Sequence, residues 1–464
     1  MNPLSLSILL CLIGVVLFAP RRWAILGMAA GVLYLNESAN FGLGLNLFPE
    51  RFLEIAGFVR VMVRKEFNFS KLNEVDRLLL LFYSYMTIVF LLRSTESQLY
   101  QIGVAVDATL CYFIFRGLIR DIDDFRWYLR AFAILLIPYV VLLLVEMRTS
   151  QNPFSLLLGG SMGHDFREGR VRCVGTFRHP SLLGTLGASF LPLYIGLAIG
   201  KTDRIWGLAG IVLCAAIALL ANSGGPISAA AVGLAGWLLW PMRAKMDVVR
   251  RCMLGLFILT AWIMKSPVWY LPARISEHLG VGGDAWHRSY LMEVAARDFG
   301  KWWFSGMSMA QTADWFPYTL PEALGSGADI TNQYLMFGLA GGLLSMILFI
   351  LLLVKGYKSL GQAMRTVRSS SPKPVETEFL LWGLGVMLSV HIENWLSISY
   401  FDQSYVLWFL QLGALVNISQ ICSQSHYRQR EKLPIFSIRH AASVLKLPNG
   451  IWKTIRKGAP RPLR

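Results

Sequence analysis

Arginine is concentrated in one polar stretch, residues 147–179, which has five arginines and no lysine. The five are Arg148, Arg167, Arg170, Arg172 and Arg178. A guanidinium group is planar and stays charged at any working pH, so it can hold a diphosphate or a carboxylate through two parallel hydrogen bonds. We therefore expect Arg170, Arg172 and Arg178 to bind an anionic ligand. Arg178 directly precedes an apolar run, and we expect it to take part in the chemistry.

These arginines also have a simpler interpretation, in which they pair with Asp165 and Glu168 or extend to lipid headgroups. His179 and Pro180 close the stretch. Proline suits the first turn of a helix, and histidine titrates near neutrality. We expect His179 to be either a substrate-binding group or the cap of a helix that begins at Pro180.

A second polar stretch, residues 265–330, contains the sequence Trp286-His287-Arg288, and an amphipathic segment extends from there to Asp298. The stretch has five Lys/Arg and seven Asp/Glu. We favour Arg288 over His287 as the functional residue. Arg288 is expected to be catalytic and His287 to contribute to substrate binding.

Four further polar residues lie where apolar runs begin or end. Asp329 could act as a catalytic base that accepts a proton from a hydroxyl group, with Asn332 binding substrate. Alternatively, Asp329 or Thr331 caps the helix that follows. His391 and Glu393 lie near the end of another apolar run, where ionisable groups are costly unless they face water or a partner. They are substrate-binding candidates that could also supply the base.

The elements that must position these residues are membrane spans. Of the 464 residues, 55% are hydrophobic and 16% are charged, and the mean hydropathy is +0.50. Soluble proteins have roughly 25% charged residues. Since a span needs about 20 mostly apolar residues, the sequence predicts an all-α polytopic membrane protein with about 12 to 14 transmembrane helices. The candidate runs are 4–20, 23–40, 47–63, 77–92, 98–118, 127–146, 180–200, 205–221, 227–242, 252–268, 331–354, 378–396 and 403–422. The third contains Glu54 and Arg60, so it lies either in the interface or buried against other helices.

Several short links between these runs are basic, as is the tail. The links are 201–204, 243–251 and 355–377. Cytoplasmic loops carry an excess of Lys and Arg, so the links and the tail are expected in the cytoplasm. Residues 147–179 and 265–330 then form outward loops, the second of them large. We expect a membrane domain over 1–422, with no loop long enough to bury its own core, and a basic cytoplasmic tail over 423–464 that includes helices on the inner leaflet.

Composition and motifs disfavour several other classes of protein. The formal charge is +16, but the tail supplies +9 of it through ten Lys/Arg and one Glu, which suits anionic lipid better than nucleic acid. The sequence has no Walker-type phosphate loop, no His-Glu-x-x-His and no Gly-x-Ser-x-Gly. Its six cysteines show no disulfide or metal spacing. We therefore expect neither a metal nor a cofactor, and the energy for any reaction must be stored in the substrate. The apolar run at 3–20 lacks a basic start and a cleavage site, which predicts an anchor.

Three motifs stand out at the ends of the apolar runs. They are GTFRHPSLLG at 175–184, ANSGGP at 221–226 and DITNQYL at 329–335, the last followed by Gly338. Together they resemble the O-antigen ligase and Wzy-type polysaccharide polymerase superfamily of bacterial inner-membrane proteins. The resemblance covers roughly residues 75 to 420.

The resemblance implies transfer of a glycan from an undecaprenyl-diphosphate carrier to an acceptor hydroxyl on the periplasmic side, with no nucleotide consumed there. Arginines would hold the diphosphate leaving group, and a base would take the proton of the acceptor. Arg288 matches the arginine of the family's large loop. The expected partners are the lipid-linked glycan, membrane lipid and other polysaccharide-assembly proteins.

Two positions depart from the pattern of the family's ligases. The ligases usually have Ser-Arg where this chain has Ser-Gly at 223–224, and His-Asn where it has Thr-Asn at 331–332. The usual base is missing, so Asp329, or His391 and Glu393, would have to replace it. This favours a polymerase of exopolysaccharide or O-antigen repeat units over a ligase. A ligase, a non-enzymatic transporter of the same glycan, a structural assembly subunit and an inactive or accessory member are the alternatives.

Overall fold

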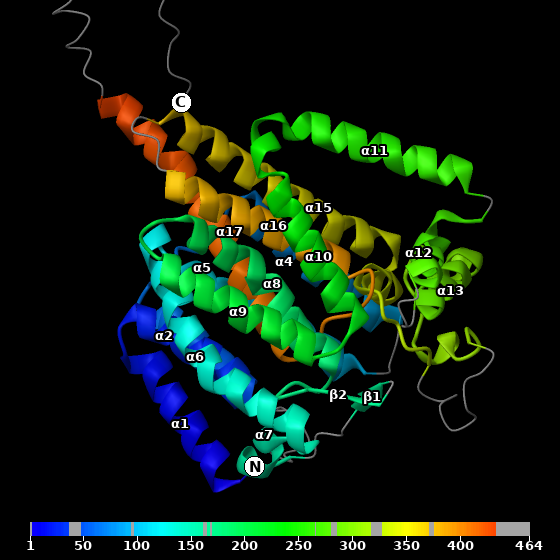
Figure 1. Cartoon of the computed structure of the whole chain (residues 1–464), viewed down its shortest axis with the longest axis horizontal. Coiled ribbons are helices and arrows are strands. Elements are labelled where there is room, and N and C mark those ends of the chain that lie inside the picture. Colours follow the sequence, from blue (N-terminus) through cyan, green and yellow to red (C-terminus); the bar gives the residue numbers. More distant parts are fainter. Residues whose placement is uncertain are drawn as a thin grey trace, which may run out of the picture.

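The protein is a bundle of helices with a single small hairpin, β1–β2, among the described residues (Figure 1). The computed structural model describes residues 2–36, 48–93, 97–160, 165–167, 169–264, 266–279, 285–316, 327–370 and 375–432. The inner-leaflet helices predicted for the tail fall in 433–464 and lie outside the described residues.

Each candidate apolar run of the sequence overlaps one α-helix of the bundle, and two of the runs also reach a short 3₁₀ helix. From the N-terminus to the hairpin, the elements are α1 (Pro3–Phe18), α2 (Arg21–Tyr34), α3 (Pro49–Val63), α4 (Glu74–Arg93), α5 (Gln98–Leu118), α6 (Ile122–Thr149), α7 (Pro153–Leu158), β1 (Asp165–Arg167) and β2 (Arg170–Arg172). The later elements are α8 (Pro180–Ile199), α9 (Arg204–Leu220), α10 (Gly224–Leu238), η1 (Trp240–Lys245), α11 (Met246–Ile263), η2 (Val268–Tyr270), α12 (Leu271–Leu279), α13 (Ala285–Arg297), α14 (Phe299–Trp302), η3 (Ala310–Thr312), α15 (Gln333–Ser369), α16 (Val375–Asn394) and α17 (Gln403–Lys432).

Seven of the described helices are long and apolar enough to cross a membrane, or eight if a bent pair at 240–275 counts as one span. The seven are α4, α5, α6, α8, α15, α16 and α17. Helices α1, α9 and α10 are apolar but shorter. The predicted all-α, polytopic membrane class is therefore confirmed. The larger number of spans expected from the sequence also counted helices of 14 to 17 residues, such as α2 and α9, which are shorter than the roughly 20 residues of a full span.

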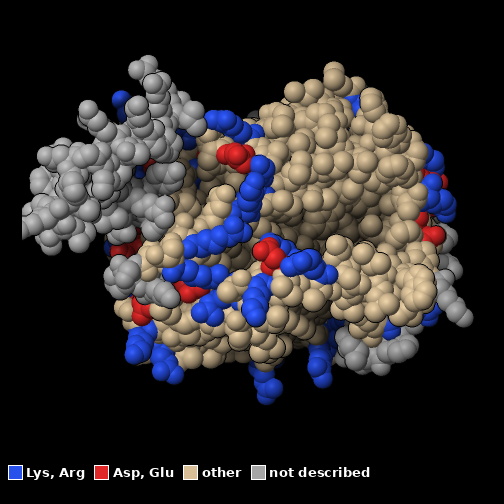
Figure 2. Space-filling view, turned by 90° about the horizontal axis from the view of Figure 1, so that it is seen from above, with Lys and Arg blue, Asp and Glu red and all other residues tan. Residues whose placement is uncertain are grey.

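The connections between helices gather at two ends of the bundle. At one end, Glu376 of α16 accepts hydrogen bonds from the backbone N–H groups of Lys201 (3.0 Å) and Thr202 (3.2 Å), while Arg243 and Arg368 both donate to Glu378. We call this the basic end. Figure 2 shows the molecule from above, with many Lys and Arg side chains gathered on the face in view.

The other end, which we call the loop end, holds the two long polar stretches. Helix α1 begins there, because Asn2 donates to the carbonyl of Leu157 in α7 at 2.8 Å. Helix α17 begins there as well, since the side chain of Gln403 donates to the carbonyl of Thr176 at 3.0 Å. The basic links and the long polar stretches thus occupy opposite ends of the bundle, as predicted from the basic links.

Helix α8 lies at the centre of the bundle, where it packs against α9, α10 and α16. Small residues bring its backbone close to α9: a Cβ atom on Gly187 would lie 2.4 Å from the carbonyl oxygen of Cys214. Close contact through small residues is a common way for helices to associate in membranes. The first residues of α8 are therefore held at a fixed depth at the loop end.

One helix takes one of its two predicted forms and another is longer than predicted. The third run is helix α3, which is packed against other helices on one face, where the guanidinium of Arg60 pairs with Glu66 at 3.0 Å and donates to the carbonyl of Val16 at 2.8 Å. Helix α15 continues well past the predicted end at residue 354, to Ser369. Its second half is amphipathic rather than apolar, and the residues that it buries there, Leu360, Ala363, Met364 and Val367, have helical spacing.

Candidate functional site

Three elements meet around Glu393, near the loop end of α16. Its Oε1 atom accepts a hydrogen bond of 2.6 Å from the hydroxyl of Ser228 on α10. Arg288 on α13 is close enough for its charge to interact with the Glu393 carboxylate. The other carboxylate oxygen is buried and has no hydrogen-bond partner among the described residues. The fold thus brings together a guanidinium and a carboxylate that lie far apart in the sequence.

A small hydrophobic core within the large loop fixes the position of α13. Leu291 and Val294 of α13 are fully buried and belong to the same cluster as Trp302, Trp315 and Leu339. The cluster is shared, because Leu335 and Leu339 from the first turns of α15 complete it. The expectation that no loop is long enough to bury a core of its own therefore stays a prediction.

The large loop is also inserted into a break in α15 at Gly342, where the backbone leaves the helical conformation. In a continuous helix, the carbonyl of Leu339 would accept a hydrogen bond from the N–H of Leu343. Here it accepts from Met307 at 2.9 Å, and Leu343 donates to the carbonyl of Trp303 at 2.7 Å. Two hydrogen bonds to the loop replace one within the helix, so the loop that carries α13 is attached to the bundle by its backbone.

Arg178 lies at the start of α8 with partners of its own. Its Nε atom pairs with Asp402 at 2.8 Å, and its guanidinium lies over the ring of Phe48 at 4.7 Å. Arg51 lies over the same ring at 5.6 Å. The two arginines expected to be catalytic, Arg178 and Arg288, therefore interact with different carboxylates.

The other arginines expected to bind substrate lie on the hairpin. In the antiparallel register, Arg170 of β2 is opposite Arg167 of β1. Arg170 is exposed, whereas Arg172 is buried. The side chains of Asp165 and Glu168, their possible partners, lie outside the described residues, so the simpler interpretation of these arginines stays a prediction.

Two of the expected site residues cap helices. The Nδ1 atom of His179 accepts a hydrogen bond of 3.1 Å from the N–H of Ser181 at the start of α8. The side chain of Asn332 accepts one of 3.0 Å from the N–H of Leu335 at the start of α15. The cap of α15 is therefore neither of the two residues proposed for it, and Asp329 is exposed in the loop before it.

His391 is enclosed rather than presented to a ligand. One ring nitrogen is hydrogen-bonded to the hydroxyl of Tyr400 at 2.7 Å, and the other to the side-chain carbonyl of Gln411. Trp395 and Trp408 pack against the ring, with centroids 5.4 and 5.0 Å away. With both nitrogens engaged and 1% of the residue exposed, His391 supports the end of α16 that carries Glu393.

His287 belongs to one of two stacked pairs of rings that involve α13. Its ring stacks on Phe316 with a centroid distance of 4.2 Å, and Trp286 stacks on Tyr290 at 5.0 Å. His287 therefore helps to hold the loop on α13. Trp286, two residues before Arg288, is exposed and adds an aromatic side chain to the surface of α13.

Two polar neighbours of the site were not predicted. Ser228 lies inside an apolar run, and nothing in the sequence distinguishes a serine with a functional role there from one with a structural role. Asp402 did have a signal, because it is an acidic residue in a short turn at the same end as the arginines. Its backbone has a positive φ of 53°, which places it at a sharp turn ahead of α17.

The fold and these ionisable groups define an all-α, multi-pass membrane protein with a polar site at its loop end. Within the described residues, no group of three or more His, Cys, Asp or Glu side chains is arranged to hold a metal ion. No protein-family model matches the chain, and no curated protein matches it.

Proposed function

We propose that the protein is a bacterial inner-membrane glycosyl polymerase that joins oligosaccharide repeat units carried on undecaprenyl diphosphate, in exopolysaccharide or O-antigen synthesis. The loop end would face the periplasm, and the basic end and C-terminal tail the cytoplasm. The observation that supports this best is the Glu393 carboxylate, which has one oxygen held by Ser228 and the other buried without a hydrogen-bond partner among the described residues, within electrostatic range of Arg288. This arrangement brings together a group that binds phosphate and a group that accepts protons.

In this mechanism Arg288 holds the diphosphate of the donor and stabilises the charge that develops on it as it leaves. Glu393 accepts the proton of the acceptor hydroxyl while the hydroxyl oxygen forms a bond to the anomeric carbon. The bond from that carbon to the diphosphate breaks, and undecaprenyl diphosphate departs. No metal or nucleotide takes part. The hydrogen bond from Ser228 orients the carboxylate.

Glu393 is a better candidate for the base than the other residues suggested by the sequence. His391 has both ring nitrogens occupied, and Asp329 is exposed in a loop. Arg178 has a secondary role in this proposal, because it would have to release Asp402 in order to bind a diphosphate. Arg170, on the exposed hairpin, is suited to attract anionic substrate.

The test is a glycan profile of a deletion strain that expresses the wild type, Arg288→Ala or Glu393→Gln at equal abundance in the membrane. Arg297→Ala is the matched control, because Arg297 lies on the same helix as Arg288, with 59% of its side chain exposed, and pairs with Asp298 instead. We expect single lipid-linked repeat units to accumulate in the Arg288 and Glu393 variants, and long polymer to form with Arg297→Ala.

Other outcomes would point to other functions. Long polymer that stays on its carrier identifies a ligase. Repeat units confined to the cytoplasmic leaflet identify a transporter. Normal polymer in both variants would contradict an enzymatic role for this site and favour an assembly subunit.

A further inference from the structure

Helix α11 stands apart from the rest of the bundle (Figure 1). Only Val249 is buried along its length, and apolar side chains on all its faces are exposed, including Met253 (62%), Phe257 (54%) and Trp262 (81%). Exposed apolar surface of this extent is rare on a monomer in water. In a membrane protein, such a surface is suited to the hydrocarbon of the bilayer, where lipid chains would cover it.

The chain bends sharply after α11, by 99° between the segments Trp240–Ile263 and Val268–Ile275. Three aromatic residues flank this bend, which we call the elbow: Trp262 at the end of α11, and Trp269 and Tyr270 in η2. Trp and Tyr concentrate at the depth of lipid headgroups. Trp269 also donates to Glu293 of α13 at 2.9 Å, so the elbow is attached to α13 within the large loop.

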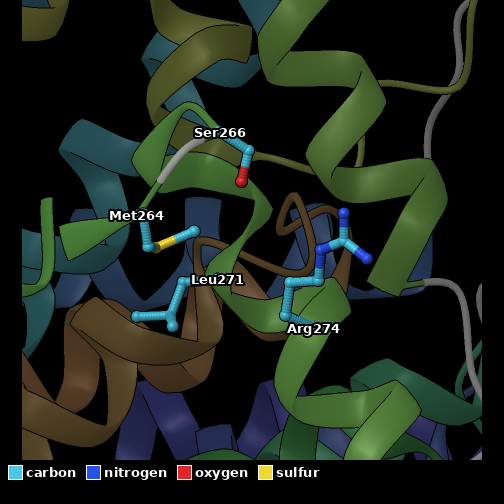
Figure 3. Close-up of a pocket in the computed structure, with 4 residues that line it drawn as sticks. All are labelled: Met264, Ser266, Leu271 and Arg274. Atoms are coloured by element: carbon cyan, nitrogen blue, oxygen red, sulfur yellow. The ribbon is translucent and has the colours of Figure 1, made fainter.

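A cavity of about 450 Å³ lies at the elbow, with a volume in the range of small-ligand sites. Met264, Ser266, Leu271 and Arg274 line it. Figure 3 shows the apolar side chains of Met264 and Leu271 on one side, and the Ser266 hydroxyl and the Arg274 guanidinium on the other. The cavity is therefore apolar on one side and polar on the other.

We propose that the elbow binds the phosphate headgroup of a bilayer phospholipid, with its acyl chains along α11. Arg274 holds the phosphate through charge-assisted hydrogen bonds and Ser266 donates another, while Met264 and Leu271 contact the start of the chains. The flanking Trp and Tyr residues and the exposed apolar surface of α11 favour a lipid of the bilayer over a soluble anion. This site is independent of the one at Glu393.

The experiment is native mass spectrometry of the full-length protein released from nanodiscs that contain phosphatidylglycerol, with undecaprenyl phosphate added in a separate arm. We expect Arg274→Gln to weaken retention of phosphatidylglycerol about tenfold, as loss of one charge-assisted hydrogen bond predicts. Arg274→Lys keeps the charge and should restore part of it. Arg297→Gln, which removes another exposed arginine of the same loop, should retain lipid as the wild type does.

Three results would overturn the proposal. Equal retention of phospholipid by the wild type and Arg274→Gln would show that the elbow does not hold the headgroup. Equal loss in Arg274→Gln and Arg297→Gln would reduce the effect to general surface charge. Retention of undecaprenyl phosphate in place of phosphatidylglycerol would assign the cavity to the carrier lipid.

Discussion

The two polar connections at the loop end are attached to the bundle in different ways. Residues 150–179 are fastened by hydrogen bonds to buried polar side chains: Glu146 accepts from the N–H groups of Val174 (2.9 Å) and Gly175 (3.1 Å), and Asn152 donates to the carbonyl of Gly175 at 2.7 Å. The large loop instead packs as a unit on a core that it shares with the first turns of α15, and it is anchored in the break of that helix.

This difference determines which contacts hold each arginine in position. Arg178 follows Val174 and Gly175, whose backbone is held by Glu146 and Asn152, so a local change there should displace Arg178 alone. Arg288 belongs to a unit, so its position depends on how the whole loop is attached. A substitution that removes the contacts of one loop should therefore displace that loop and leave the other in place.

The largest effect is expected for Gly342→Val. The glycine has a φ of +77°, and a Cβ atom there would lie 2.3 Å from the carbonyl oxygen of Phe304. Strain and the clash together should cost about 4 kcal/mol and detach the large loop. Thermal unfolding in detergent and limited proteolysis of residues 285–316 would measure this. Gly361→Ala, at a helical position with open space around it, is the control and should be neutral or stabilising. Equal resistance to protease in both variants would contradict the anchoring role of the break.

A somewhat smaller effect is expected for Glu146→Ala. This change removes the acceptor of two backbone N–H groups and leaves them buried, which should cost about 3 kcal/mol. Hydrogen exchange should rise at Val174 and Gly175 and stay unchanged on α13. Glu146→Gln keeps one acceptor oxygen and should lie between alanine and the wild type. If exchange rose equally in both loops, they would not be separate units.

Acid should loosen the large loop through Asp298. Burial by itself would raise the pKa of this carboxyl, but hydrogen bonds from Lys301 (3.1 Å) and Trp315 (3.0 Å) outweigh it and hold the pKa below its ordinary value. The stabilisation is therefore complete above the unfolded pKa of about 3.9 and is lost as the pH falls through the folded pKa. Exchange on α13 should increase below about pH 4 in the wild type. In Asp298→Asn it should be faster at neutral pH and show less change with acid.

The smallest effect concerns the chemical reactivity of one cysteine, Cys173, and not the stability of the protein. Cys173 is fully buried, and burial raises the pKa of its thiol to about 12. At pH 8 its thiolate fraction should be about a thousandfold below that of an ordinary cysteine. Labelling with N-ethylmaleimide should therefore be very slow at Cys173 and fast at an introduced Gln151→Cys, which is exposed in the same loop. Rapid labelling of Cys173 would show that this loop opens readily.

The helices could be predicted from the sequence because their signal is local. Apolar runs and capping residues lie within each segment, so even the short helix α10 was located correctly. The extension of α15 beyond residue 354 was missed because its second half is charged on one face. The signal was present, since Leu360, Ala363, Met364 and Val367 recur at the spacing of a buried helical face.

The site could be predicted only as a set of candidates. Arg288 and Glu393 were both named, but nothing in either segment shows that they meet, because the contact depends on how α13 and α16 pack. His179 and Asn332 were ambiguous for a physical reason: a polar side chain ahead of a helix has the same sequence signature whether it caps the helix or binds a ligand. The break in α15 was also hidden, since its two glycines lie within an uninterrupted apolar run.

The break in α15 has a consequence for biosynthesis. A polar backbone group without a partner costs several kcal/mol in lipid, so Leu339 and Leu343 need Met307 and Trp303 when the helix inserts. These partners precede α15 in the chain and leave the ribosome first. The large loop can therefore reach its side of the membrane before the helix that it completes. A permuted chain in which α15 were made before the loop would expose this backbone during insertion, and the order of synthesis protects the natural chain from that step.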